Sequence, residues 1–489
     1  MSKAIALTES QKRVLDSLKA FTDSPRRVFL LKGYAGTGKT TLMRFFIRYL
    51  IEKKRSFELL APTGRAAKVL SDMVLDSRFE SQSTMLGQTI HSLIYKYKGF
   101  NRQVSEAELK SSNAVGQLSL CFEAVVPEYD EHSKPKIYIV DEASMISDTP
   151  TQGASQALFG TGRLLTELMA YDTRAESKYL FVGDPCQLPP VGSVVSPALD
   201  EEWYHPKAMS ATLTEIMRQE GGNDLVRVSM QIRKMEALAP DDERYYGGRK
   251  NWLKLPLRHS PNIVLHRTVD EMVAHYEKGV KENGYDHSVF ICHSNKSNNL
   301  IAEQVRRSLG FGGQLPQKGE LLLVIQNSIT TGLVNGDMVE VVNVSDLTKE
   351  RGGLTFVEVR VKECVSGRIF STLLLADTLW SAQLNLSQIQ QTNLFVNFFL
   401  RMKGLGIEQG SMAFNDKLRT DPYLNALRCT YGYAVTCHKA QSGEWDDVYL
   451  HLPRNIGLNP TKQTYRWLYT AITRARQRLH IVDDYLYLQ

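Results

Sequence analysis

The chain has 489 residues, 43% hydrophobic and 23% charged, with a formal net charge of +6, which is typical of a soluble globular protein of about two to four domains. No run of about 18 apolar residues is present and the first residues lack the apolar core of a signal peptide, so we expect neither a membrane span nor a secretory leader. The six cysteines are scattered, without a CxxC pair or a histidine cluster at zinc spacing, which favours a reduced, cytoplasmic setting. The positive charge permits a polyanionic partner without requiring one.

Short apolar runs alternate with helical patterns along most of the chain. The first run, Val28 to Leu31, precedes a glycine-rich loop and then a helical pattern whose apolar residues fall on one face. Further runs lie at residues 57–61, 137–140, 179–182, 289–292, 448–450 and 479–482. Strands interleaved with helices in this way predict an α/β fold with parallel sheets.

Two regions interrupt this alternation, and we interpret both as insertions into α/β cores. Residues from about 97 to 135 are polar and irregular. Residues from about 321 to 430 first show the alternation of a strand, at Val357, Val359 and Val361, and then a helical pattern around 389–402.

The first chemical motif runs from Gly33 to Thr41 and matches the phosphate-binding pattern GxxxxGK followed by Ser or Thr. Its glycines allow a tight loop whose N–H groups face nucleotide phosphates, and the following helix adds positive potential. Lys39 supplies a point charge and Thr40 offers a hydroxyl to Mg²⁺. The motif predicts a site for ATP and Mg²⁺, against the alternative of a simple glycine-rich turn. Its nucleotide-binding candidates are Gly33, Ala35, Gly36, Thr37, Gly38, Lys39, Thr40 and Thr41.

An acidic pair, Asp141 and Glu142, directly follows the apolar run at 137–140. At the carboxyl end of a buried strand, Asp141 can hold hydrated Mg²⁺ and Glu142 can orient or deprotonate the attacking water. Alone the pair could equally be a solvated turn, but beside a phosphate-binding loop it predicts hydrolysis. A third run ends in the segment 183–192, where Gln187 could sense the γ-phosphate; the alternative is a proline-rich turn.

These motifs, with others that follow in order, resemble the superfamily 1 helicases of the RecD/Dda-like branch. Leu7 to Gln11 is similar to the Q motif of that branch, and the loop at 33–41 and the acidic pair are similar to its motifs I and II. The remaining matches are 61–68 (motif Ia), 88–92 (Ib), 183–192 (III), 213–219 (IV), 435–445 (V) and 468–476 (VI). The order and spacing of the motifs are more specific than any one of them.

The resemblance implies roles for residues outside the phosphate-binding loop. It places Arg218 and Arg474, from a second α/β domain, on the γ-phosphate, where their charge lowers the barrier to hydrolysis. It implies that Gln11 reads the adenine and that Glu444 accepts a hydrogen bond from the ribose. Met217 stands where related motors often carry an aromatic residue, so stacking on adenine is expected to be weak. The arginines and Glu444 could instead be surface residues.

The same resemblance implies that a nucleic-acid strand crosses both α/β domains, held by groups that contact phosphates without reading sequence. The candidate contacts are Thr63, Arg65, Thr89 and His91 in the first domain and Asn295, Thr436, His438 and Lys439 in the second. His91 and His438 could alternatively be buried structural histidines.

We accordingly predict two RecA-like motor domains with inserted modules. The first (1A) spans 1–217 and carries a pin region (1B) at about 97–135, where Phe100 and Phe122 are candidate wedges unless they pack against the core. The second (2A) comprises 218–320 and 431–489, and the insertion at 321–430 (2B) is predicted to be an SH3-like module with a helical arm.

From the resemblance we expect an ATP-dependent DNA helicase that moves 5′-to-3′ on single-stranded DNA and unwinds forked duplex DNA. Two alternatives stay open: a motor that acts on RNA, and a nucleotide-gated, strand-binding ATPase that unwinds nothing. We expect a cytoplasmic monomer, associated with the nucleoid when working and without membrane contact. The sequence identifies no protein partner.

Overall fold

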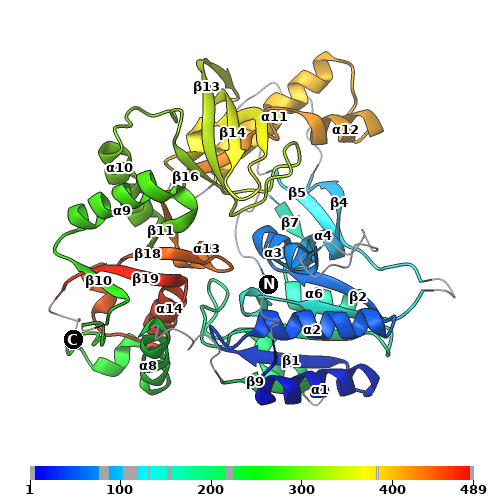
Figure 1. The fold of residues 1–489 in the computed structure, drawn as a ribbon. Coiled ribbons are helices and arrows are strands. Elements are labelled where there is room, and N and C mark those ends of the chain that lie inside the picture. The colour runs from blue at the N-terminus through cyan, green and yellow to red at the C-terminus, as the bar shows by residue number, and fades with distance from the viewer. Residues whose placement is uncertain are drawn as a thin grey trace.

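The computed structural model describes residues 6–75, 87–102, 118–129, 133–150, 157–205, 208–215, 224–258, 260–381, 383 and 385–484. Two parallel sheets, a closed barrel and a three-stranded sheet form its β-structure (Figure 1). This arrangement confirms the predicted α/β class with added β-rich modules. Within these ranges, no helix is long and apolar enough to cross a bilayer.

The first sheet contains six parallel strands in the order β3-β2-β6-β8-β1-β9. The strands are β1 (Val28–Gly33), β2 (Ser56–Ala61), β3 (Gln88–Thr89), β6 (Lys136–Val140), β8 (Lys178–Gly183) and β9 (Ala208–Leu213). The four apolar runs predicted for this part of the chain all lie in these strands. Their continuous apolar character follows from burial of the sheet on both faces.

Helices cover both faces of the first sheet. One face packs against α1 (Glu9–Asp23), α2 (Lys39–Glu52) and α3 (Gly64–Leu75), and the other against α4 (Ile90–Ile94), α6 (Leu164–Tyr171) and α7 (Glu201–Tyr204). Because successive strand residues point to opposite faces, Phe29 and Leu31 of β1 enter the first core while Val28 and Leu30 enter the second.

The second sheet has five parallel strands in the order β10-β19-β18-β11-β17. They are β10 (Ile263–His266), β11 (Ser288–Cys292), β17 (Ala434–Thr436), β18 (Trp445–His451) and β19 (Ala475–Val482), and they contain the three remaining predicted runs. One face packs against α8 (Asp224–Leu238), α13 (Cys437–Ala440) and α14 (Lys462–Ile472), and the other against α9 (Val269–Asn283) and α10 (Asn295–Ser308). Figure 1 shows α8 and α14 on the side of the sheet opposite to α9 and α10.

The predicted β-rich insertion is a closed five-stranded barrel. Its strands are β12 (Leu321–Val324), β13 (Met338–Arg351), β14 (Leu354–Glu363), β15 (Ile369–Leu375) and β16 (Leu427–Tyr431). The alternating valines of β14 are buried, and the charged residues between them are exposed. The predicted helical pattern forms α11 (Gln388–Gly404), followed by α12 (Met412–Thr420), and we call these two helices the arm. The SH3-like class and the domain boundaries stay predictions.

A three-stranded sheet occupies part of the predicted pin region. It pairs β4 (Tyr95–Phe100) with β5 (Leu120–Ala124), and β5 with β7 (Ala157–Phe159). The region at 97–135 therefore contains regular strands in its described part, because its sparse aromatic residues are enough to pack one face. Residues 103–117 and 130–132 lie outside the described residues.

Both candidate wedge aromatics pack against neighbouring elements. The Phe100 ring lies 5.0 Å from that of Phe395 and 5.3 Å from that of Phe399, both in α11. The Phe122 ring stacks on Phe159 of β7 at 4.7 Å. The arm is thereby joined to the three-stranded sheet through an aromatic cluster.

Short 3-10 helices complete the described secondary structure. They are η1 (Ala143–Met145), η2 (Pro197–Leu199), η3 (Glu243–Tyr246), η4 (Tyr285–His287), η5 (Ala376–Thr378) and η6 (Arg454–Gly457).

Candidate nucleotide site and strand-binding surface

The phosphate-binding loop connects β1 to α2. Gly36 and Gly38 have φ values of 77° and 78°, a region that favours glycine, so these residues make the tight turn feasible. Gly38 begins α2 without a side-chain cap, which leaves the first N–H groups of the helix available to an anion. The Lys39 ammonium donates to the carbonyl oxygens of Gly33 at 2.7 Å and of Tyr34 at 3.2 Å. The loop thus gathers backbone donors and one ammonium group, as phosphate binding requires.

The acidic pair lies immediately after β6, and its electrostatics couple it to the loop. Burial raises the pKa of Asp141 and raises that of Glu142 to about 7. The Asp141 charge adds to the rise at Glu142, while Arg474 and Lys39 oppose it. A carboxylate that titrates near neutral pH is suited to accept a proton from water.

The donor set also fits Mg²⁺, which prefers carboxylate and hydroxyl oxygens. Thr40 is exposed in the first turn of α2, and the Asp141 carboxylate accepts the N–H of Glu142 at 2.9 Å through one oxygen only. Lys39 is close enough to Asp141 to lower its pKa, which places hydroxyl, ammonium and carboxylate groups in one region.

The motif after β8 connects the first sheet to the second. The Tyr469 hydroxyl, from α14, donates to Asp184 at 2.8 Å and accepts the N–H of Ala35 in the phosphate-binding loop at 2.9 Å. Tyr469 is 1% exposed, so both hydrogen bonds are shielded from water. A single phenol therefore joins the loop, the end of β8 and the second domain.

Gln187 follows Asp184 in the same motif and is 5% exposed. Its Oε1 has no hydrogen-bond partner among the described residues. A buried amide oxygen without a partner is unfavourable by about 1–3 kcal/mol. A water molecule in the cleft would relieve this cost, which fits the predicted position of Gln187 beside the reacting group.

Arg474 comes from the second domain, directly after α14, and is 5% exposed. Its guanidinium donates to the carbonyl oxygens of Thr470 at 3.1 Å and Gly443 at 3.3 Å, and to the Thr473 hydroxyl at 3.2 Å. Because its charge lowers the pKa of Glu142, the guanidinium lies near the acidic pair across the cleft. The other predicted arginine, Arg218, lies outside the described residues, as does Met217.

The two residues predicted to read adenine and ribose lie at the edges of this arrangement. The Gln11 side chain donates to the carbonyl of Thr37 at 3.1 Å and accepts the N–H of Thr8 at 3.1 Å, which fixes it against the phosphate-binding loop. Glu444 lies 3.5 Å from the guanidinium of Arg476 in an ion pair that is partly exposed. The adenine and ribose roles stay predictions.

The predicted strand contacts of the first domain lie at the carboxyl ends of β2 and β3. Thr63 and Thr89 use their hydroxyls to accept N–H groups at the starts of α3 and α4. The His91 ring packs edge-on against Phe159 at 4.9 Å, and burial lowers its pKa. Their hydroxyls and ring thus also have structural partners within the protein.

Arg65 connects three parts of the molecule. Its guanidinium lies 5.1 Å from the centre of the Trp445 ring of the second sheet and donates to the Gly336 carbonyl of the barrel at 3.5 Å. Lys68, one turn further along α3, forms an ion pair with Glu363 of the barrel. Motif Ia is therefore in direct contact with both the second sheet and the barrel.

The predicted contacts of the second domain follow β11 and β17. Asn295 begins α10, and Thr436 precedes α13, which contains His438 and Lys439. The Lys439 ammonium has no hydrogen-bond partner within the described residues, and burial lowers its pKa to about 8. The ammonium is itself buried, so in the described part of the chain it lacks both a protein partner and contact with solvent. The nucleic-acid-binding roles of these residues stay predictions.

Two families match the sequence in chain order. Residues 6–243 match the AAA domain, and residues 431–482 match the UvrD-like helicase C-terminal domain. The first match covers the phosphate-binding loop and the acidic pair, and the second covers Arg474 and Tyr469. Together the two matches support the resemblance to the superfamily 1 helicases.

Curated relatives of this chain are distant and longer. The ATP-dependent RecD2 DNA helicase of Deinococcus radiodurans is 26% identical over 242 residues, which is 49% of this chain and 25% of that protein. An uncharacterized protein of Methanocaldococcus jannaschii is 23% identical over 94% of this chain and 37% of its own length. An uncharacterized protein of Acanthamoeba polyphaga mimivirus is 25% identical over 39% of this chain and 34% of its own length. The chain thus matches about a quarter to just over a third of these relatives, and the RecD2 match agrees with the predicted RecD-like branch.

Solved structures of Pif1 helicases are also similar to the chain. A Bacteroides Pif1 in complex with ADP-AlF3 and single-stranded DNA has a TM-score of 0.46 at 16% identity, with 99% of this chain and 95% of that chain covered. Pif1 from Candida albicans has a TM-score of 0.42 at 17% identity, with 98% and 96% covered. The fold described above rests on the strand order of this chain and not on these similarities.

Three cleft residues could not be identified from the sequence. Asp184 and Tyr469 lie inside motifs III and VI, but their mutual hydrogen bond joins positions that the sequence does not connect. Arg233 of α8 lies in no motif, and its guanidinium is 3.0 Å from the centre of the Tyr34 ring in the phosphate-binding loop. Only the packing of the second domain on the first could have revealed it.

Proposed function

We propose that this superfamily 1 protein is an ATP-dependent DNA helicase that moves 5′-to-3′ along single-stranded DNA and unwinds forked duplexes. The observation that carries the proposal is the buried Tyr469 bridge between the phosphate-binding loop and the second domain. A nucleotide bound in that loop would alter the position of Ala35, and through Tyr469 the position of the second sheet. The name of the RecD2 relative, an ATP-dependent DNA helicase, supports the substrate and the energy source.

The hydrolysis step divides between the two domains. Lys39 and the backbone amides at the start of α2 hold the phosphates, and Glu142 accepts a proton from the attacking water. Thr40 and Asp141 would hold Mg²⁺, which neutralises charge on the phosphates when it is bound. Arg474 faces Glu142 from the second domain, so its charge stabilises the transition state only when the cleft is closed.

Closure of the cleft would also move the strand-binding surface. Arg65 contacts Trp445, and Trp445 begins β18 of the second sheet, so the separation of the two sheets acts directly on motif Ia. Thr436 and Lys439 move with the second sheet as one rigid group. Alternate tightening of these two sets of contacts would convert hydrolysis into directed movement.

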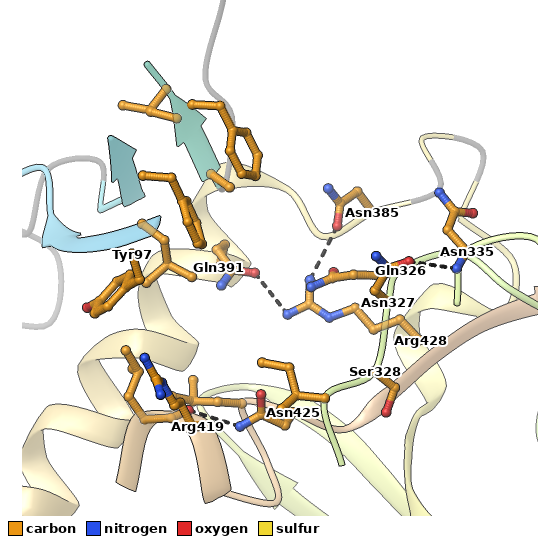
Figure 2. Close-up of a pocket in the computed structure, with 18 of the residues that line it drawn as sticks. Tyr97, Gln326, Asn327, Ser328, Asn335, Asn385, Gln391, Arg419, Asn425 and Arg428 are labelled. Carbon is orange, nitrogen blue, oxygen red and sulfur yellow. Dashed lines mark hydrogen bonds between the residues drawn. The ribbon is translucent and has the colours of Figure 1, made fainter. Parts of the chain in front are cut away.

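A cavity of about 950 Å³ extends this surface between the three-stranded sheet, the barrel and the arm (Figure 2). Figure 2 shows Arg428 inside it, with hydrogen bonds to Asn385 at 3.3 Å and Gln391 at 3.2 Å. Tyr97 adds an aromatic face, and most other polar lining groups are amides or hydroxyls. An aromatic face can stack on any base, so we include this cavity in the proposed strand path.

The arm braces the sheet that would meet the duplex. Phe395 and Phe399 hold Phe100 from the arm side, and Phe122 is held by Phe159. We therefore propose that the described aromatics stiffen the pin and that they do not themselves insert between base pairs. A rigid pin resists the duplex while the motor pulls one strand.

The test is an unwinding assay on forks with either a 5′ or a 3′ single-stranded tail, made of DNA or of RNA. With ATP and Mg²⁺, we expect unwinding of the 5′-tailed DNA fork alone. Equal activity on the 3′-tailed fork would contradict the polarity. Stronger ATPase stimulation by RNA would show that the protein acts on RNA. An ATPase that neither single-stranded DNA nor single-stranded RNA stimulates would identify a nucleotide-gated switch.

A further inference from the structure

Three histidines from separate elements meet on the face of the second sheet that lies away from α14. His266 ends β10, His275 lies in α9 and His480 lies in β19. Their candidate ligand nitrogens all lie within 4.8 Å of one another, and His266 Nε2 is 3.1 Å from His480 Nδ1. His266 and His480 are 3% and 0% exposed, while His275 is half-buried. The cluster is therefore shielded from solvent on the side of the sheet and partly exposed on the side of α9.

Two of the histidines also have a hydrogen-bond partner outside the cluster, on one of their two ring nitrogens. His480 Nε2 lies 3.4 Å from Asp447 Oδ1, and His275 Nδ1 lies 2.9 Å from the Tyr449 hydroxyl. Arg478 donates to both oxygens of Asp447 at 2.7 Å, which keeps this carboxylate in place as a hydrogen-bond acceptor. Histidines that bind metals usually have such an orienting partner on the second ring nitrogen.

We propose that His266, His275 and His480 form a binding site for a divalent cation of the zinc class. Zinc binds imidazole nitrogens at about 2.0–2.1 Å with tetrahedral angles, so two of its ligands stand roughly 3.4 Å apart. The pair of His266 and His480 is already near that spacing. His275 completes the set by a small shift of its half-buried side chain, and water from the open side takes the fourth position. Magnesium, which prefers oxygen ligands, does not suit the site.

The surroundings of His266 and His275 favour neutral rings. Burial and the neighbouring histidines lower the pKa of His266 to about 4, and they also lower that of His275. Their lone pairs are therefore free of protons at neutral pH, as metal binding requires. Without a metal, the same rings would simply share hydrogen bonds, and this is the outcome that the experiment must separate.

The position of the site predicts a structural role. His480 and Tyr449 alternate along their strands with Ile481 and Val448, which face α14 and the nucleotide cleft. A metal would thus join β10, β19 and α9 on the face away from the cleft. We expect it to stabilise the second domain and to leave the DNA-stimulated ATPase unchanged.

The test is a Co²⁺ titration of the full, untagged chain after removal of metal with a chelator. We expect one equivalent of Co²⁺ to produce the strong visible absorption of a tetrahedral site, and Zn²⁺ to displace it. His275→Ala should abolish the absorption. Tyr449→Phe, which removes only the orienting hydroxyl, should weaken Co²⁺ binding by roughly 10- to 100-fold.

The matched control is His287→Ala, which removes an exposed histidine of the same domain that pairs with Asp446 outside the cluster. This variant should bind Co²⁺ as the wild type does. Zn²⁺ should raise the melting temperature of the wild type and of His287→Ala but not that of His275→Ala, and circular dichroism without metal confirms that each variant is folded. Absence of tetrahedral absorption in the wild type, or absorption that survives His275→Ala in folded protein, would refute the site.

Discussion

The two parallel sheets share an architecture but differ in the chemistry at their carboxyl ends. In the first sheet, β1 and β6 lead into the phosphate-binding loop and the acidic pair, Asp141 and Glu142. In the second sheet, β11 and β17 lead into polar segments that begin at Asn295 and Thr436, and the cleft receives Tyr469 and Arg474. Under the proposed function, the loops at the strand ends give hydrolysis to the first sheet and the response to nucleotide to the second.

The largest expected effect comes from removing the ammonium of the first sheet. Lys39→Ala should reduce ATP hydrolysis by at least roughly a hundred- to a thousandfold, the usual cost of losing one essential charge donor. Lys53→Ala removes an exposed lysine just after the same helix and should retain wild-type turnover. Near-normal hydrolysis by Lys39→Ala in a steady-state ATPase assay would contradict the assigned role of the first sheet.

Glu142→Gln separates binding from hydrolysis in that sheet. The variant should bind ATP with near wild-type affinity while turnover falls by about a hundredfold or more, because the amide cannot accept the proton of water. In the wild type, turnover should fall as the pH decreases below about 7, since Glu142 must be ionised and its pKa is raised to about 7. Loss of ATP binding by equilibrium titration would make Glu142 a structural residue.

The same carboxyl predicts a pH-dependent stability difference. Its folded-state pKa of about 7 exceeds the ordinary value of 4.5, so the folded chain retains a proton that the unfolded chain releases. The wild type should therefore lose stability relative to Glu142→Gln as the pH rises from 4.5 to about 7, and the gap should then stay constant. Denaturant unfolding at several pH values measures the unfolding free energies of the two proteins. A wild type that keeps or gains stability relative to Glu142→Gln over this interval would contradict the assigned burial.

Tyr469→Phe tests the connection between the two sheets. Loss of the hydroxyl leaves Asp184 without its 2.8 Å partner, so we expect DNA-stimulated turnover to fall roughly tenfold. The basal ATPase should change less, because the phosphate-binding loop loses only the hydrogen bond at the Ala35 N–H and keeps Lys39. Tyr465→Phe, on the same helix, is the control, and DNA should stimulate its ATPase as it does that of the wild type. Equal stimulation of the two variants would remove Tyr469 from the coupling.

A smaller effect is expected where the arm supports the pin. Phe399→Leu removes the ring that contacts Phe100 at 5.3 Å, and aromatic pairs contribute about 0.5–1.5 kcal/mol. We expect the unwinding rate to fall by a few-fold while DNA-stimulated ATPase stays within about twofold. Leu400→Ala, an exposed neighbour on α11, should leave both rates unchanged. Parallel losses of ATPase and unwinding would show that the arm acts on the motor itself.

The contiguous features of the molecule could be predicted from the sequence. All seven apolar runs form strands, because a strand buried on both faces needs an uninterrupted run of apolar residues. The phosphate-binding loop and the acidic pair are short segments whose chemistry depends on adjacent residues. Their positions at strand ends follow from the same pattern.

Features that depend on long-range packing could not be predicted. The Tyr469 bridge joins residues 434 positions apart, and Phe100 meets an arm nearly 300 residues later in the chain. The histidine cluster has no ligand spacing in the sequence, since β10, α9 and β19 come together only when the sheet forms. Lys68, which is half-buried in α3, pairs with Glu363 of the barrel for the same reason.

The central claim is that nucleotide in the cleft changes how the two domains hold a strand. Its most direct test is the affinity for a single-stranded DNA oligonucleotide measured with no nucleotide, with ADP and with a non-hydrolysable ATP analogue, in the wild type and in Tyr469→Phe. We expect affinities that differ by at least roughly fivefold between nucleotide states, which corresponds to a typical coupling free energy between two sites, and a smaller difference in Tyr469→Phe. Identical affinity of the wild type in all three states would contradict it.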